Sequence, residues 1–168
     1  MKKIILIVTV MAVFSSCKKE EIIEQGQQQQ PPEQPKVTTE IKSIKHGTSF
    51  AMCVGYCNKE STYTVDKVVY QVSGKKRKPR TYNETLTADE WKLFRTQVNV
   101  ETFFKLPKVT GCPDCNDGGA EWVEIETTAG QKHKVTFDFR KEPESLKDLV
   151  SSLRQFEWEL EIKRKDFK

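Results

Sequence analysis

The chain has 168 residues, which suffices for one domain with a leader and a tether and is too short for two ordinary domains. Charged residues make up 31% and hydrophobic residues 36%, a composition typical of a soluble protein with a modest core. The formal net charge is +4, of which Lys2 and Lys3 supply two charges. Such a balanced charge argues against nucleic-acid binding, which requires a concentrated basic surface.

The N-terminus has the pattern of a secreted lipoprotein. An apolar run from Ile4 to Phe14 follows the two lysines and is shorter than the about 20 residues that a membrane-spanning helix needs. The run ends in Ser15-Ser16-Cys17, which resembles the lipobox where bacterial lipoproteins are cut before a lipid-bearing cysteine. We therefore expect residues 1–16 to be a signal peptide and Cys17 to carry lipid, with a plain secretory signal as the alternative.

Residues 17–40 form the expected tether. The segment from Lys18 to Lys36 is rich in Gln, Glu and Pro and lacks apolar periodicity, so it cannot bury enough surface to offset the entropy of ordering. Its Lys-Glu-Glu at residues 19–21 resembles the surface-export signal of lipoproteins in Bacteroidota. We expect an outer-membrane lipoprotein that carries palmitate, has the membrane as a partner, and faces the periplasm or the cell surface.

Strand patterns dominate the first half of the folded region, which we place at residues 41–162. A first strand is expected at residues 37–44, and apolar residues spaced by two change phase at Asp66-Lys67, which indicates a tight turn or bulge. A Gly- and Pro-flanked basic loop follows, before a return strand at residues 81–85. Such loops are usually just solvated, but this one is also a candidate patch for an anionic partner: Lys75, Lys76, Arg77, Lys78 and Arg80.

Capping chemistry predicts a helix that begins after Thr87. Glu90 lies three residues beyond Thr87, which gives a capping box, and Leu86 and Trp91 are spaced as a hydrophobic staple. Trp91 and Phe94 then share one helical face. We expect this face to pack on the sheet.

The clearest hairpin of the sequence is centred on Thr128-Ala129-Gly130. A two-residue turn would place the apolar residues of the two strands on opposite faces, whereas this three-residue loop puts them on one face. The resulting register sets Glu124 opposite Lys134 and Glu126 opposite Lys132.

The C-terminal part predicts a second helix and a final strand. Pro143 can open the helix, whose apolar residues at positions 146, 149, 150 and 153 follow helical spacing. After Gln155, apolar and acidic residues alternate to Ile162, which predicts a strand with one wet face; a continued helix is the alternative, and residues 163–168 form a basic tail. The expected fold class is α+β, an antiparallel sheet of about five strands with two helices packed on one face.

Four cysteines remain in the folded region once Cys17 is set apart: Cys53, Cys57, Cys112 and Cys115. A secreted domain usually oxidises such cysteines to structural disulfides. Loop entropy favours crossed pairs, at about 4 kcal/mol against about 2 kcal/mol for local pairs, whereas turn geometry favours the local pairs that we expect. A four-thiolate zinc site and a thiol–disulfide enzyme are the alternatives, although the second motif opens no helix that would lower a thiol pKa.

The acidic residues beside the second motif are candidate calcium ligands: Asp114, Asp117 and Glu121. They miss the EF-hand spacing, and loops before strands are commonly acidic in any case. His133 lies on the apolar face of its strand, which favours a packed core residue over a ligand or base. The sequence contains no serine motif, phosphate-binding loop or carboxylate pair that indicates catalysis, and it predicts no cofactor.

Residues Ser49–Cys57 and Gly111–Trp122 resemble a family of uncharacterised lipoproteins from Bacteroidota, which carry a Cys-x-Gly-x-Cys stretch early in a small domain of unknown function. The resemblance covers roughly residues 42–156. The second motif, Gly-Cys-Pro-Asp-Cys, is less general in that group than the first, which implies that each cysteine pair can exist alone and favours local bridges. The family supplies no activity.

Together these features predict a lipid-anchored protein of the cell envelope that acts as a non-enzymatic binding or structural module. An envelope protein or an anionic glycan is the expected partner, and nucleic acid is not. The alternative function is an envelope thiol–disulfide or metal-binding protein, with zinc or calcium as the metal.

Overall fold

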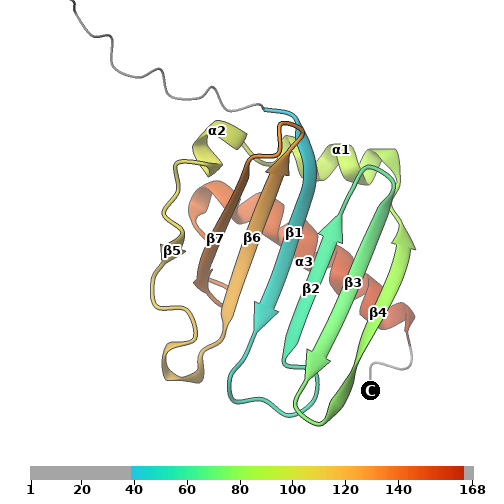
Figure 1. Ribbon diagram of the computed structural model, residues 1–168, viewed down its shortest axis with the longest axis vertical. Helices are drawn as coiled ribbons and strands as arrows, with labels where there is room; N and C mark the ends of the chain where they lie inside the picture. The colour runs from blue at the N-terminus through green and yellow to red at the C-terminus, as the bar shows by residue number, and fades with distance from the viewer. Residues whose placement is uncertain (1–38, 165–168) are drawn as a thin grey trace, which may run out of the picture. The chain divides into compact units, whose positions relative to one another are not determined.

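The computed structural model describes residues 39–164, which form an α+β domain (Figure 1). Its seven-stranded sheet has the strand order β4-β3-β2-β1-β6-β7-β5, and α3 crosses one face of it. Neighbouring strands are antiparallel except β5 and β7, which are parallel. The predicted α+β class is confirmed, but the described residues hold seven strands and three α-helices instead of about five and two. The predicted leader, Cys17 and most of the tether lie outside the described residues.

The first half of the sheet consists of four consecutive antiparallel strands: β1 (Ile41–Ser49), β2 (Asn58–Tyr63), β3 (Lys67–Gly74) and β4 (Arg77–Thr85). β1 continues five residues past the predicted end at Ile44. The predicted tight turn between β2 and β3 is confirmed, since the N–H of Thr64 donates to the carbonyl oxygen of Lys67 at 2.9 Å. This turn explains why the apolar pattern changes phase.

The predicted hairpin is present, but its turn is shorter than the predicted basic loop. β4 already begins at Arg77, and only Lys75 and Lys76 form the turn, in which Lys76 has a φ of 59°. Pro79, which suggested a loop, therefore lies inside a strand. It is tolerated because β4 is an edge strand and because the β3–β4 register shifts beside it.

Helix α1 (Ala88–Thr96) begins as predicted. Oγ1 of Thr87 accepts from the N–H of Glu90 at 3.2 Å, and Oε2 of Glu90 accepts from the N–H of Thr87 at 2.8 Å. This reciprocal pair is the predicted capping box, and it satisfies donors that a helix N-terminus otherwise leaves free. Trp91 and Phe94 are both buried, as their spacing predicted.

The helix predicted to open at Pro143 begins with a 3-10 turn, η2 (Glu144–Leu146), before α3 starts at Lys147. Three short elements were not predicted: α2 (Val100–Phe103), β5 (Val109–Thr110) and the 3-10 turn η1 (Cys115–Asp117). None is long enough to show a hydrophobic period, so sequence patterns do not report them. The side chain of Asn99 caps α2 by accepting from the N–H of Thr102 at 2.9 Å.

The second half of the sheet contains the predicted hairpin. β6 (Ala120–Thr127) and β7 (Lys132–Asp138) pair in the predicted register, with Glu124 opposite Lys134. Gly130 has a φ of 80°, the left-handed conformation that the three-residue loop requires.

Helix α3 (Lys147–Lys163) is continuous, so the predicted final strand at residues 156–162 is wrong. Phe156 and Leu160 extend the helical spacing of the residues that pack on the sheet. Trp158 and Ile162, which completed the apparent alternation, are 58% and 59% exposed. The alternation therefore arose from apolar residues that lie on both sides of one helix.

The main core lies between one face of the sheet and the helices. Side chains from β1, β2, β3, β6 and β7 meet α1, α2 and α3 there. Its fully buried members with the largest side chains are Tyr63, Phe94, Phe103, Phe137, Ile44, Ile125, Leu146, Leu149 and Leu153. No helix among the described residues is long and apolar enough to cross a membrane.

Candidate functional site

Both cysteine motifs form local disulfides, as predicted. The Cα atoms of Cys53 and Cys57 lie 5.6 Å apart, and those of Cys112 and Cys115 lie 5.5 Å apart. Each bridge closes a loop of only a few residues, so turn geometry rather than loop entropy decides the pairing. Bridged sulfurs are not thiolates, so within residues 39–164 none of these four is available to ligate zinc or to attack a disulfide.

The two bridged loops lie at the same end of the sheet, at the bottom of Figure 1, and contact each other. The N–H of Ala51 donates to Oδ1 of Asp114 at 3.4 Å, and Nζ of Lys75 donates to the carbonyl oxygen of Ala51 at 3.0 Å. A Cβ on Gly74 would lie 1.8 Å from the carbonyl oxygen of Gly55, so only glycine permits this approach. The bridges thus stabilise three loops that pack together.

The structure does not bring the three candidate calcium ligands together. Asp114 and Asp117 lie in the bridged loop with left-handed φ values of 63° and 59°, whereas Glu121 is fully buried beneath α3. Glu121 lies on the helix-covered face of β6, so its carboxylate points away from that loop. Within residues 39–164, no three His, Cys, Asp or Glu side chains are grouped so as to hold a metal ion.

The predicted basic patch is divided between two environments. Lys75, Lys76, Arg77 and Lys78 are exposed at the end of the β3–β4 hairpin. Arg80 instead lies with its guanidinium carbon 5.6 Å from the ring centre of Tyr56. Binding of an anionic partner by the four exposed residues stays a prediction.

A buried charge cluster that was not predicted from the sequence lies between the sheet and α3. We call it the His46 cluster, and it consists of His46, Glu121, Glu142, Arg154 and Glu157. His46 has no exposed surface, and its Nε2 and Nδ1 each lie 2.8 Å from a carboxylate oxygen, of Glu121 and Glu157 respectively. Arg154 donates to Glu121 through Nε at 2.7 Å and Nη2 at 2.6 Å, and to Glu142 through Nη1 at 3.1 Å and Nη2 at 2.7 Å.

The protonation states of this cluster follow from its contacts. Burial by itself lowers the pKa of His46, but the charge of Glu157 and hydrogen bonds to both carboxylates outweigh it and raise the pKa to about 9. Burial by itself raises the pKa of Glu121, but hydrogen bonds from His46 and Arg154 outweigh it and lower the pKa to about 2. His46 is therefore a cation at neutral pH, and both ring nitrogens donate.

Further hydrogen bonds extend the cluster along α3. The hydroxyl of Tyr63 donates to Oε1 of Glu157 at 3.0 Å, and Nζ of Lys59 lies 2.6 Å from Oε1 of Glu161, which also accepts from the hydroxyl of Tyr70. A pocket of about 200 Å³ opens beside these residues. Because its polar groups already bond to one another, the cluster holds α3 on the sheet rather than offering a free base or acid.

A spacing in the sequence does mark this cluster. Arg154, Glu157 and Glu161 follow the i, i+3, i+7 spacing of one helical face, but the strand assigned to residues 156–162 concealed it.

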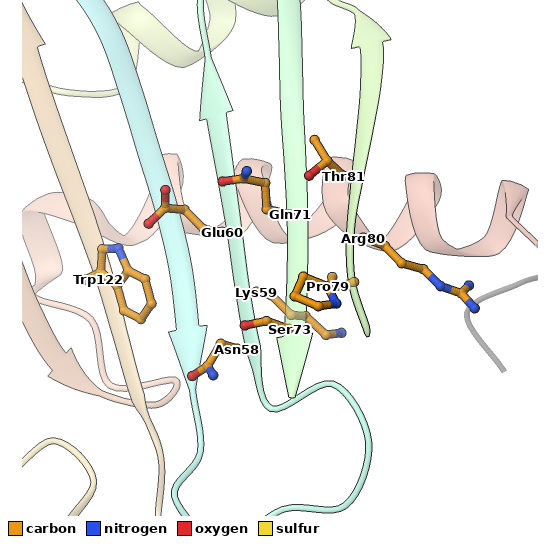
Figure 2. A pocket seen from close by; sticks show the side chains of 10 residues that line it. Asn58, Lys59, Glu60, Gln71, Ser73, Pro79, Arg80, Thr81 and Trp122 are labelled. Carbon is orange, nitrogen blue, oxygen red and sulfur yellow. The ribbon is translucent and has the colours of Figure 1, made fainter. Parts of the chain in front are cut away.

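The opposite face of the sheet carries a shallow groove of about 310 Å³ beside Trp122 (Figure 2). No helix of the described part of the chain covers this face, and α3 lies behind the sheet in both figures. We call this feature the open-face groove. Its residues come from β2, β3, β4 and β6: Asn58, Glu60, Gln71, Ser73, Pro79, Thr81 and Trp122, with parts of Lys59, Val72 and Arg80.

The groove follows one cross-strand row of the sheet. Trp122 is directly opposite Gly47, Gly47 is opposite Glu60, Glu60 is opposite Gln71, and Gln71 is opposite Thr81. Directly paired residues in a sheet point to the same face, so these side chains form a line across five strands. Sequence patterns did not reveal this line, because it depends on four separate strand registers.

Gly47 makes room for the indole of Trp122. A Cβ at residue 47 would lie 2.2 Å from Cζ2 and 2.5 Å from Cε2 of Trp122, so the ring occupies the space above this glycine. Nζ of Lys134 lies over the ring, 4.2 Å from its centre. The indole is half-buried and rests against the strand backbone, which leaves it little freedom to reorient.

The rest of the groove offers unused hydrogen-bonding groups. The side chains of Asn58, Gln71, Ser73 and Thr81 form no hydrogen bond with any described residue, and Glu60 has only the ammonium of Lys45, at 3.7 Å. Figure 2 shows Arg80 pointing away from the groove. The open-face groove therefore combines one fixed aromatic ring with uncharged polar side chains and one carboxylate, Glu60, whose charge is balanced by Lys45.

Comparison with protein-family models and with curated proteins finds no match to this chain. The fold and the site by themselves define its class: a disulfide-bridged α+β domain whose sheet is covered by helices on one face and open on the other.

Proposed function

We propose that this chain is a lipid-anchored protein of the cell envelope whose folded domain is a non-enzymatic binding module. The open-face groove is the observation that carries the binding role. It is a concave surface with a fixed tryptophan and unused polar groups, and such surfaces characterise ligand sites. The local disulfides support an oxidising compartment, which agrees with the secretion signal read from residues 1–16.

The His46 cluster supports binding over catalysis. A general base needs a nitrogen or carboxylate oxygen that can reach a substrate proton, and both ring nitrogens of His46 already donate to carboxylates. The raised pKa of His46, about 9, also keeps this side chain protonated at neutral pH. The cluster therefore serves as a structural support beneath the sheet in this proposal.

The anchor is tested with Cys17→Ala, in cells grown with an alkyne-labelled palmitate. We expect the wild-type chain in the membrane fraction with label, and the variant in the soluble fraction without label, because two or more acyl chains are needed for stable anchoring. Ser16→Ala is the matched control, since it keeps a small residue before the cysteine and should stay labelled. Membrane retention of Cys17→Ala would refute the anchor.

A further inference from the structure

We infer that the open-face groove binds a linear neutral glycan, with one pyranose ring stacked on Trp122. This inference names the ligand class for the proposed binding function and rests on it. It starts from the ring itself, whose inner side lies against Gly47 and whose position is fixed by that contact. A flat aromatic ring buries the apolar C–H face of a sugar, and it does so at little entropic cost when it is already immobile.

The polar groups beyond the ring match sugar hydroxyls. A hydroxyl both donates and accepts, and it is best met by a mixture of carboxylate, amide and hydroxyl groups. Glu60 supplies acceptors, Gln71 and Asn58 supply both donors and acceptors, and Thr81 and Ser73 supply hydroxyls. Four of these five side chains form no hydrogen bond with any described residue and are available to a ligand, and Glu60 has only the ammonium of Lys45 at 3.7 Å.

The length of the row favours a chain of sugars over a single one. Trp122 and Thr81 are separated by four strand spacings, or about 19 Å at about 4.8 Å per spacing. Several linked pyranose rings span this distance. The row runs across the strands rather than along an edge, so a bound peptide would find no backbone ladder to join.

Charge determines which glycans fit. Glu60 lies within the row and forms an ion pair with Lys45. Near the Trp122 ring, Glu124 of β6 lies directly opposite Lys134 of β7. A polyanionic glycan would meet the carboxylate of Glu60, whose partner Lys45 is already engaged, and it would not find the guanidinium of Arg80, which lies at Tyr56 and points away from the groove. The balance of charges therefore selects an uncharged chain.

Lys134 occupies the outer side of the ring when no ligand is bound. Its side chain is exposed, and a cation–π contact at an exposed site contributes only about 0.5–1 kcal/mol. A stacked sugar must displace this ammonium. Lys134→Ala removes this competing contact, so it should lower the dissociation constant by about two- to fivefold, which is the factor that corresponds to the energy of the cation–π contact.

The test uses the full chain in a detergent without a sugar headgroup. The neutral probes are cellohexaose, xylohexaose, mannohexaose, maltohexaose and chitohexaose; hexagalacturonate and pentalysine are the charged probes. Binding is measured by calorimetry and by the indole N–H resonance of Trp122, which is assigned by its loss in Trp122→Ala. We expect saturable binding of at least one neutral probe with a shift of this resonance.

Variants localise the binding. Trp122→Ala should weaken it by about 30-fold or more, as loss of a central aromatic contact does, and Gln71→Ala by about fivefold for one hydrogen bond. Trp158→Ala is the matched control, because this tryptophan is 58% exposed on α3. The variant should bind the probe with the same affinity as the wild-type protein.

The experiment distinguishes two outcomes: that the groove binds a ligand other than a neutral glycan, and that the groove binds no ligand. If only hexagalacturonate or pentalysine shifts the Trp122 resonance, the groove is a binding site and the neutral-glycan inference is wrong. If no probe shifts it, or if Trp122→Ala keeps the affinity of a bound probe, the groove is not the ligand site and both proposals fall. Weaker binding by Lys134→Ala would contradict stacking on the outer side of the ring.

Discussion

Nε2 of His46 lies 2.8 Å from Oε1 of Glu121, and both side chains are fully buried between the sheet and α3. The two residues are separated by 75 positions in the sequence and come from adjacent strands, β1 and β6. Removal of one partner of a buried ion pair leaves the other charge without compensation, which costs far more than removal of a surface charge. The stability of the domain should therefore fall sharply when either charge of this pair is removed.

Glu121→Gln tests that statement. The substitution keeps the shape of the side chain but removes the charge that pairs with both His46 and Arg154. We expect the free energy of unfolding in urea to fall by about 3–5 kcal/mol. Glu124→Gln is the control, because Glu124 lies on the same strand and points to the open face, and it should change stability by about 0.5 kcal/mol or less. Equal losses in the two variants would show that the buried pair does not stabilise the domain.

The free energy of unfolding should be highest between about pH 4.5 and pH 6.5. The pKa of Glu121 is lowered from 4.5 to about 2, so its contribution is complete above pH 4.5 and is lost as the pH falls toward 2. The pKa of His46 is raised from 6.5 to about 9, so its contribution is complete below pH 6.5 and is lost as the pH rises toward 9.

Urea unfolding at a series of pH values measures this profile. Between pH 5.5 and pH 8.5 we expect a loss on the order of 2–3 kcal/mol, from about 1.4 kcal/mol for each pH unit above 6.5. A second measurement follows the carbon-bound ring protons of His46 by NMR, which should titrate near pH 9. Stability that rises steadily up to pH 8.5, or a ring that titrates near 6.5, would contradict a protonated His46.

The local disulfides predict two separable losses of stability. Each of the double variants Cys53→Ser/Cys57→Ser and Cys112→Ser/Cys115→Ser should lower the free energy of unfolding by about 2 kcal/mol, because each bridge closes a short loop. Both variants should remain folded. Alkylation of the oxidised protein followed by mass spectrometry should find these four cysteines blocked and should map each bridge within its own motif. Free thiols with a bound zinc ion would instead support the metal-binding alternative.

Gly47→Ala should displace the indole of Trp122. The new Cβ would lie 2.2 Å from Cζ2 of Trp122 and 2.8 Å from the carbonyl oxygen of Lys59, so the ring must move. We expect a shift of the Trp122 indole resonance and a loss of about 1–3 kcal/mol in the free energy of unfolding. Gly118→Ala is the control, because its φ is −71° and its Cβ would lie 3.2 Å from the nearest atom. An unshifted resonance in Gly47→Ala would mean that the ring does not rest on this glycine.

Local chemistry in the sequence predicted several parts of the fold correctly. The capping box of Thr87 and Glu90, the three-residue loop that ends in Gly130, and the two short disulfides each depend on residues a few positions apart. Turn and capping geometry restrict such contacts before any tertiary packing exists. The β6–β7 register followed because a shift by one residue would turn the apolar side chains to the wrong face.

Only the tertiary structure decided where the charged and aromatic residues lie. From the sequence, Glu157 was predicted to be a solvent-exposed strand residue. Its carboxylate instead bonds to His46, which lies 111 positions earlier, because α3 continues through this segment and turns the side chain toward the sheet. Likewise, the row from Trp122 to Thr81 exists only when four strand pairings are in register. Composition and local spacing thus predicted the class of domain and favoured local cysteine pairs, which the structure contains. Its buried charges and its open binding face required packing between distant segments, which no local pattern encodes.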